Sequence, residues 1–246
     1  MTEDLIYFLA AGFLAQLVDG ALGMAYGVTA SSLLMSVGVP PVAASATVHA
    51  AECFTTGASA LSHRAFGNIS KALFRRLLLP GVVGAIIGSY VLTAIPGDII
   101  KPWVGGYLLL LGLYIIAKAF RQFEPKEVRT HLTPLAFIGA MLDAMGGGGW
   151  GAIVTSNLLA RGNDVRETIG SVNAVEFFVT LASSAVFIST LGLGHLKIIA
   201  ALALGGLLAA PLGDWFCGRV PRRPFMILVG VLITALSART VWLALV

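Results

Sequence analysis

Four consecutive glycines, Gly146 to Gly149, separate two apolar segments in the second half of the chain. Each glycine inside a helix costs roughly 1 kcal/mol relative to alanine, so a helix that reaches this run must end there. Asp143 precedes the run, and a short apolar segment at 152–160 follows Gly151. Inside a bilayer, backbone that leaves helical geometry is tolerated only where protein buries it or where it lines a wet cavity. We therefore interpret residues 143–151 as half of a solute-binding site.

Composition places this break inside a membrane. The chain has 246 residues, of which 57% are hydrophobic and 11% charged, and this predicts an all-α polytopic membrane protein. The acidic start at residues 1–4 differs from the basic start of a cleavable signal peptide, so we expect the first helix to direct insertion. The formal net charge of +4 comes from basic residues grouped in loops, which is a topology signal and argues against nucleic acid as a partner. Cys53 and Cys217 lie in apolar runs without metal-type spacing, and we interpret them as buried thiols.

The apolar segments divide into two halves. The first half holds segments at 5–22, 28–37, 42–62, 77–95 and 99–119, and glycines interrupt the pattern after the first of them. A polar, charged stretch follows near the midpoint of the chain. We therefore predict a first transmembrane repeat at 1–120, a cytoplasmic linker at 121–131 and a second transmembrane repeat at 132–246.

The second half repeats the first. A shift of 124 positions without a gap matches 11 of 38 residues between 19–56 and 143–180. Two acids and three glycines are among the matches, which shared apolar composition does not produce. The matched pairs are Asp19 and Asp143, Gly23 and Gly147, Gly27 and Gly151, Ser32 and Ser156, Leu34 and Leu158, Gly38 and Gly162, Val48 and Val172, Ala50 and Ala174, Glu52 and Glu176, Phe54 and Phe178, and Thr56 and Thr180. A shift of 125 then matches Gly88 with Gly213, Pro96 with Pro221 and Gly105 with Gly230. The chain is predicted to be a tandem repeat of two half-transporter units.

Loop charges predict that the two repeats are inverted. Basic loops at 64–76 and 121–129 are separated by two long segments, so both can be cytoplasmic, and the loop at 96–98 between them is then outside. Its repeat partner at 219–223 carries three arginines and is expected in the cytoplasm. Matching loops therefore lie on opposite sides, and both termini are expected outside.

The number of crossings stays open at this point. Segments 133–145 and 152–160 are each shorter than the roughly 20 residues that a helix needs to span a bilayer. They form either a re-entrant hairpin, which gives three spans and one hairpin in each half, or tilted helices that give five crossings. In the first version, the glycine-broken short helices of the two repeats meet near the midplane.

Each glycine break precedes a helix start, which is a candidate anion site. The first N–H groups of a helix are unpaired and lie at the positive end of its dipole. The alternative is that these glycines only allow close helix packing, but four in a row exceed that need. Tyr26 and Trp150 occupy equivalent places and either wall the site or only pack. The predicted solute-binding residues are Gly147, Gly148, Gly149, Trp150, Gly151, Thr155, Ser156, Asn157 and Asn173 in the second repeat, and Gly23, Tyr26, Gly27, Ser31 and Ser32 in the first.

A polar stripe on one long helix of each repeat is the candidate coupling site. Its members are spaced by three, four and three residues, which places them on one helix face: His49, Glu52, Thr56 and Ser59, and then Asn173, Glu176, Thr180 and Ser183. A carboxyl in mid-membrane must face the interior, be paired or be protonated. We predict coupling roles for Glu52, Glu176, Asp19, Asp143 and His49. The alternatives are neutral packing for the glutamates, helix capping for the aspartates and a structural hydrogen bond for the histidine.

The remaining polar residues give weaker indications of function. His63 with Arg64 is interpreted as an interfacial anchor, and Asp214 and Arg239 are candidates for an ion pair. We find no P-loop, no metal-ligand motif and no nucleophile beside a base. The chain is therefore predicted not to be an enzyme, and no catalytic residue, cofactor or resident metal is expected.

The glycine-rich break carries a family resemblance. Residues 139–151, followed by a short helix and the loop 161–163, resemble the sulfite exporter TauE/SafE family of membrane permeases. The resemblance covers nearly the whole chain, including 48–52 and its copy 172–176. It implies a transporter of small sulfur-containing anions, including sulfite and organosulfonates. The first-repeat motif at 20–27 departs from the family pattern because it lacks the glycine run, and neither copy has the proline that many relatives carry in the following short helix.

These features predict a secondary transporter of a small sulfur-containing oxyanion, sulfite or an organosulfonate, that is proton-coupled and works by alternating access. An ionised glutamate repels a nearby anion and a protonated one does not, which is the physical reason for expecting protons to couple. The alternative is a transporter of Na⁺ or a divalent metal that uses the intramembrane carboxyls, and a membrane scaffold is a third hypothesis. We expect an integral protein of a bacterial plasma membrane. Its expected partners are a small anionic solute and the lipid bilayer, and a homo-oligomer is left open.

Overall fold

The structure is a helical bundle. The computed structural model describes residues 2–120, 131–161, 163–192, 194–217 and 219–245, and every regular element in those ranges is helical. The elements are α1 (Thr2–Leu22), α2 (Tyr26–Ser36), α3 (Pro41–Ala65), α4 (Lys71–Ala94), α5 (Gly97–Ala119), α6 (Leu132–Gly146), the π-helical turn η1 (Gly151–Thr155), α7 (Ser156–Ala160), α8 (Val165–Leu191), α9 (Leu196–Phe216) and α10 (Arg222–Leu245). The prediction of an all-α protein is confirmed. The predicted linker at 121–131 lies, apart from His131, outside the described residues.

Six described helices are long and apolar enough to cross a membrane. The qualifying stretches are Leu5–Leu22, Lys71–Ala94, Gly97–Ala119, Val165–Leu191, Leu196–Phe216 and Arg223–Leu245. Helix α3 has 25 residues but carries polar side chains along its buried face, which lowers its hydropathy, and α6 has only 15 residues. The prediction of a polytopic membrane protein is therefore confirmed.

The glycines that match between the two halves make equivalent contacts. A Cβ at Gly88 would overlap the carbonyl of Met141, and a Cβ at Gly213 would lie 2.9 Å from the carbonyl oxygen of Leu17, which is 124 positions before Met141. Close backbone approach through small residues is the usual way in which membrane helices pack. The same chain positions therefore bring α4 onto α6 and α9 onto α1.

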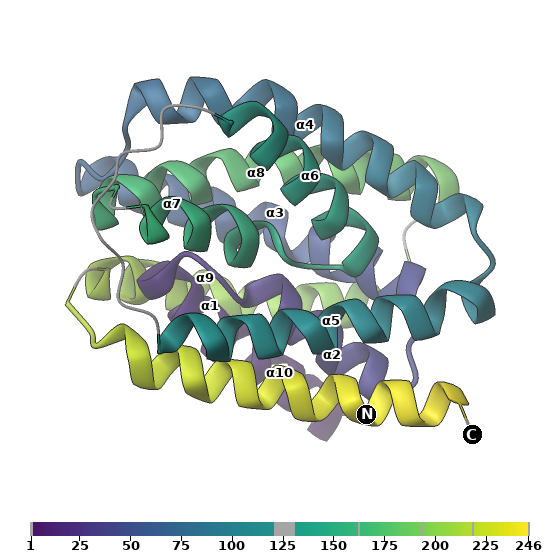
Figure 1. The fold of residues 1–246 in the computed structure, drawn as a ribbon. Helices are drawn as coiled ribbons and strands as arrows, with labels where there is room; N and C mark the ends of the chain where they lie inside the picture. The colour runs from purple at the N-terminus through teal and green to yellow at the C-terminus, as the bar shows by residue number, and fades with distance from the viewer. Residues whose placement is uncertain (1, 121–130, 162, 193, 218, 246) are drawn as a thin grey trace.

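Equivalent helices of the two halves pack antiparallel. Gly105 of α5 faces Val241 of α10, whereas Gly112, two turns later, faces Thr234, two turns earlier. Helices α3 and α8 run antiparallel in the same way, because Cys53 contacts Ser184 and Ser59 contacts Asn173. Figure 1 shows α5 and α10 side by side along the length of the bundle.

Helix α6 and the segment formed by η1 and α7 make a hairpin. Gly139 of α6 packs against Val154 of η1, and a small cavity lies between His131 and Arg161 at the open end of the two arms. Figure 1 shows the chain doubling back between α6 and α7. The arms have 15 and 10 residues, which is less than the roughly 20 that a crossing needs. These lengths favour a re-entrant hairpin over two full crossings.

Candidate functional site

The chain leaves helical geometry at two equivalent places, the first break at residues 23–25 and the second break at 147–149. The backbone of each break touches the helix start that follows the other break. A Cβ at Gly148 would overlap the backbone of Gly27 and Val28, and a Cβ at Gly151 would overlap the carbonyl of Gly23. The glycine run is therefore needed for contact with the other repeat as well as for ending α6.

Backbone conformation gives a second reason for glycine in the second break. The φ angles of Gly147, Gly148 and Gly149 are +70°, +153° and +142°, a region that residues with a side chain rarely adopt. The first break forms without a glycine run, with φ of +68° at Gly23 and +102° at Ala25. Strain at Ala25 is therefore held by the surrounding packing.

Asp143 and Asp19 cap the helix starts that follow the two breaks. Asp143 Oδ1 accepts a hydrogen bond of 2.9 Å from the backbone N–H of Trp150. Asp19 accepts from the backbone N–H of Tyr26, the residue equivalent to Trp150. Helix capping, the alternative role considered for these aspartates, therefore accounts for one oxygen of each carboxyl. The second oxygen of each remains available for other chemistry.

His49 and Asp143 form a buried pair across the two repeats. His49 Nε2 lies 3.1 Å from Asp143 Oδ2, and His49 Nδ1 lies 2.8 Å from the carbonyl oxygen of Ser45. A carbonyl oxygen only accepts, so Nδ1 carries a hydrogen. A hydrogen bond between Nε2 and Oδ2 then requires one further proton, held by either the imidazole or the carboxyl. This arrangement can store a transferable proton where α3 meets α6.

Glu52 and Glu176 are buried beside the breaks. Glu52 Oε1 faces Gly27, since a Cβ at Gly27 would lie 2.8 Å from it. Among the described residues, Glu52 Oε2, Glu176 Oε2 and Asp19 Oδ2 have no hydrogen-bond partner. Glu52 and Glu176 also interact electrostatically with Asp19 and Asp143. The four carboxyls predicted to couple transport therefore form one cluster, although their role remains a prediction.

The predicted polar side chains divide into those with an atom that has no hydrogen-bond partner and those whose polar atoms are engaged. Thr155 Oγ1 and Asn173 Oδ1 are buried and have no partner among the described residues. The other donors bond within the protein: Ser31 to the carbonyl of Gly147, Ser32 with Ser237, Ser156 to the carbonyl of Ala152, and Asn157 to the carbonyl of Ile153. The Thr155 hydroxyl could donate to an anionic solute without rearrangement. The free Asn173 oxygen only accepts, and Asn173 Nδ2 already donates to Ser59 at 3.2 Å, so Asn173 and the other donors need their present bonds to break.

Tyr26 and Trp150, at the two helix starts, each donate a side-chain hydrogen bond to a neighbouring long helix, α9 and α8 respectively. The Tyr26 hydroxyl donates to the carbonyl of Leu202 at 3.1 Å, and Trp150 Nε1 donates to the carbonyl of Val172 at 3.2 Å. Both side chains are fully buried. Core packing and one hydrogen bond each are enough to explain why these two positions hold aromatic residues.

Sequence reasoning missed a second buried cluster, around His63 and Asp214. Asp214 Oδ1 accepts from Ser59 at 2.9 Å and lies 3.2 Å from His63 Nε2, and Asn68 contacts His63 Nδ1 at 3.1 Å. The interpretation of His63 as an interfacial anchor is wrong, because its side chain is buried. The expected pairing of Asp214 with Arg239 is also wrong, since Arg239 donates to the carbonyl of Ser36 on α2. The available signal was Gly213, a repeated glycine that brings Asp214 against α1.

Replacing Asp214 with alanine should lower the free energy of unfolding by about 3 kcal/mol, because it leaves the buried Ser59 hydroxyl without its acceptor and the buried His63 ring without the neighbouring carboxyl. The matched control is Ser89→Ala at the repeat-equivalent position, where the hydroxyl bonds only to the carbonyl of Ala85. That variant should lose about 1 kcal/mol or less. Thermal unfolding of both variants in detergent measures the difference, and equal losses would contradict the cluster.

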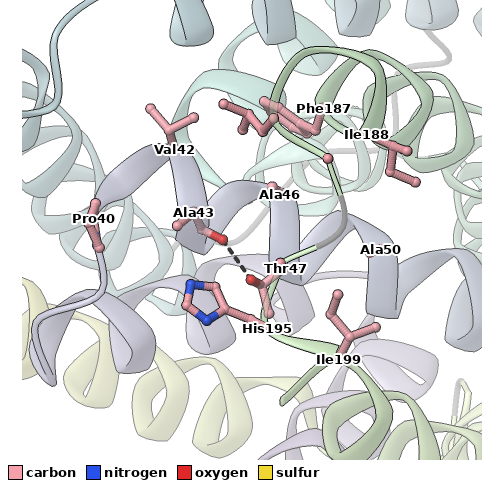
Figure 2. Close-up of a pocket in the computed structure, with 13 residues that line it drawn as sticks. Pro40, Val42, Ala43, Ala46, Thr47, Ala50, Phe187, Ile188, His195 and Ile199 are labelled. Atoms are coloured by element: carbon pink, nitrogen blue, oxygen red, sulfur yellow. Dashed lines mark hydrogen bonds between the residues drawn. The ribbon is translucent and has the colours of Figure 1, made fainter. Parts of the chain in front are cut away.

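A pocket of about 260 Å³ opens near the His49–Asp143 pair, between the start of α3, the end of α8 and the start of α9. Figure 2 shows Phe187 and His195 among its lining residues, with Thr47 donating to the carbonyl of Ala43 in the wall. The Phe187 ring centroid lies 5.8 Å from that of His49. Phe187 therefore contacts both the pocket and the histidine of the pair, and its repeat equivalent is His63.

Comparisons with known proteins find similarity to membrane transporters. A family model described as sulfite exporter TauE/SafE matches residues 8–240. The chain is 40% identical over 255 residues to a Bacillus subtilis (strain 168) protein named probable membrane transporter protein YtnM, covering 98% of this chain and 85% of that protein. It is 24% identical over 142 residues to the probable membrane transporter protein ORF9 of a Sinorhizobium species, covering 58% of this chain and 53% of that protein. No solved structure matches the chain.

Proposed function

The chain belongs to the sulfite exporter TauE/SafE family, and on that premise we propose that it carries sulfite or an organosulfonate across a bacterial plasma membrane, coupled to protons. The family and the names of the relatives indicate a membrane transporter and not an enzyme. The substrate class, the coupling ion and the alternating-access cycle are the proposed parts.

The contact between the two breaks is the observation that carries this proposal. Helix α2 and the helical segment from Gly151 begin at these breaks, in the same buried region. Their first N–H groups have no carbonyl one turn earlier within the helix, and the positive dipole ends favour an anion. Discontinuous helices that meet between repeats form the solute site in many secondary transporters. We place the oxyanion there, with the Thr155 hydroxyl as a side-chain donor that has no hydrogen-bond partner among the described residues.

The surrounding carboxyls supply the reason for proton coupling. An anion that enters beside ionised Glu52, Glu176, Asp19 and Asp143 is repelled, and protonation removes that repulsion. The His49–Asp143 pair is a place where such a proton can be held. Solute binding and proton binding then favour one another, which is positive linkage between the two ligands.

Alternating access follows in this proposal from an inverted arrangement of the halves. The antiparallel packing of α5 with α10 and of α3 with α8 supports that arrangement, because equivalent helices that cross a membrane in opposite directions belong to oppositely oriented repeats. Basic loops at 64–76 and 219–223 are then cytoplasmic, and both termini are outside. Rocking of one repeat against the other would expose the breaks to each side in turn.

Sulfite uptake into proteoliposomes with an imposed pH gradient tests the proposal. We expect Glu52→Gln and Glu176→Gln to lose gradient-driven accumulation while keeping solute exchange, because an amide cannot release a proton. The matched control is Glu167→Gln, which alters an exposed glutamate in the first turn of α8. A flux that ignores both the gradient and the two buried substitutions would reject proton coupling.

The same assay separates the cation alternative. In the described part of the chain, no group of three or more His, Cys, Asp or Glu side chains is arranged to hold a metal ion. The carboxyl cluster therefore gives no specific support to a divalent metal as the transported ion. Uptake driven by a Na⁺ gradient at constant pH would favour the cation hypothesis over the proton.

A further inference from the structure

Two grooves on the flank of the bundle occupy repeat-equivalent positions. The basic groove, of about 780 Å³, lies between α3, α4 and α8 and is lined by residues within 57–75 and 174–178. The apolar groove, of about 720 Å³, lies between α3, α8 and α9 and is lined by residues within 50–54 and 181–207. The segments that line one groove match the segments that line the other when the sequence is shifted by 124 or 125 positions. The repeat therefore offers two grooves of similar volume for comparison.

The two grooves differ in charge. Lining residues of the basic groove include Arg64, Lys71 and Arg75, and their equivalents in the apolar groove are Ile188, Leu196 and Ala200. No described carboxylate forms an ion pair with any of the three cations, and all three are exposed. Three unneutralised cations at one end of an apolar groove call for an anionic partner that also has an apolar part.

Local geometry fits a phosphate at the charged end. Lys71 is the first residue of α4, so the unpaired N–H groups and the positive dipole end of a 24-residue helix lie beside its side chain. Arg75 follows one turn later on the same face of α4, and Arg64 lies in the last turn of α3. Side chains from two helices thus converge on the mouth of the groove.

The rest of the groove fits acyl chains. Its wall contains three phenylalanines in edge-to-face contact, Phe74 with Phe178 at 5.9 Å and Phe177 with Phe178 at 5.1 Å between ring centroids. Leu61 adds a side chain that is 70% exposed in the structure. Aromatic and aliphatic surface of this kind is covered by lipid in a membrane.

We propose that the basic groove is a binding site for one anionic phospholipid, with its phosphate held by Arg64, Lys71 and Arg75 and its acyl chains along the phenylalanine wall. Basic pockets between membrane helices on the cytoplasmic side recognise anionic head groups in this way. The positive-inside rule puts the loop at 64–76 on that side. The apolar groove lacks the cations and has no preference for lipid charge.

Native mass spectrometry of the purified full chain, titrated with dioleoyl phosphatidylglycerol or dioleoyl phosphatidylcholine, tests the site. We expect phosphatidylglycerol to bind more tightly than phosphatidylcholine. The double variant Arg64→Gln, Arg75→Gln should weaken phosphatidylglycerol binding roughly 30-fold, as expected for two lost head-group cations. Binding of phosphatidylcholine should not change.

Two further variants keep the result interpretable. Arg161→Gln with Arg166→Gln removes the same charge from exposed positions near the start of α8, outside the groove, and should leave lipid binding unaltered. That region lies beside the basic groove, because Ser171 of α8 contacts Ser70. Ile188→Arg with Ala200→Arg places cations in the apolar groove, and this variant should bind a second phosphatidylglycerol.

Three results would overturn the site. Equal weakening by the two arginine-to-glutamine pairs would mean a diffuse surface charge. Equal affinity for the two lipids in the unaltered chain would mean a groove indifferent to head groups. Competition by soluble glycerol phosphate at concentrations similar to those of the lipid would mean a small-anion site without a role for acyl chains.

Discussion

A Gly148→Ala variant is expected to unfold roughly 10 °C below the unaltered chain and to lose transport. Two costs add. The φ angle of +153° is strained for alanine, at roughly 1–3 kcal/mol. The new Cβ would overlap the backbone of Gly27 and Val28, which cannot rotate away as a side chain would, and overpacking costs about 1–3 kcal/mol. The breaks must separate to make room, so the solute site should be lost with the stability.

Glycines elsewhere in the chain separate these two costs. Gly38 has φ of +96° and no atom near a Cβ position, so Gly38→Ala meets only the conformational cost, about 1 kcal/mol. Gly97 has neither a positive φ nor a close neighbour, and Gly97→Ala should behave as the unaltered chain. Thermal unfolding in detergent and sulfite flux in proteoliposomes measure all three variants. If Gly148→Ala unfolds at the same temperature as Gly38→Ala, then Gly148 does not contact the backbone of Gly27 and Val28.

Asp143→Ala is expected to lower the free energy of unfolding by about 3–5 kcal/mol, because it leaves a buried partner uncompensated. The Trp150 N–H loses its cap and His49 loses its carboxyl in the same substitution. Proton-driven sulfite flux should fall at least tenfold, since neither the break nor the proton-holding pair survives. Thermal unfolding and flux under a pH gradient measure the two effects.

Asp143→Asn separates capping from proton storage. An asparagine oxygen can still accept from the Trp150 N–H, so most of the stability should return, while the gradient response should remain lost. Asp19→Asn is the comparison at the repeat-equivalent position, because Asp19 also accepts from the Tyr26 N–H but its Oδ2 has no hydrogen-bond partner among the described residues. A normal gradient response in Asp143→Asn would remove the His49–Asp143 pair from the mechanism.

Much of the candidate site was predictable because its signals are local and duplicated. The glycine run predicted where α6 ends, and the structure ends it at Gly146. The stripe on α3 and α8 predicted a buried polar face, and Glu52, Glu176 and their stripe neighbours are buried. Repetition at a constant shift distinguished these residues from chance polar positions.

The misplaced residues share one cause. His63 near the end of α3 has the sequence environment of an interfacial anchor, and Asp214 lies in an apolar run with an arginine farther along the chain. Their actual partners, Ser59, Asn68 and each other, depend on how α3 and α9 are rotated where they pack. No periodicity within either segment reports that rotation.

The sequence by itself determined the helical class, the positions of the two breaks and the repeat, because glycine propensity, hydropathy and duplication act over short stretches of chain. Only the tertiary structure decided which residues of distant segments meet: His49 with Asp143, His63 with Asp214, and the backbone of Gly148 with that of Gly27. Where a membrane helix has no polar stripe, its lipid-facing and core-facing surfaces are both apolar, so hydropathy does not tell which face turns inward. Contacts between helices far apart in the chain settle that rotation, and with it the composition of the site.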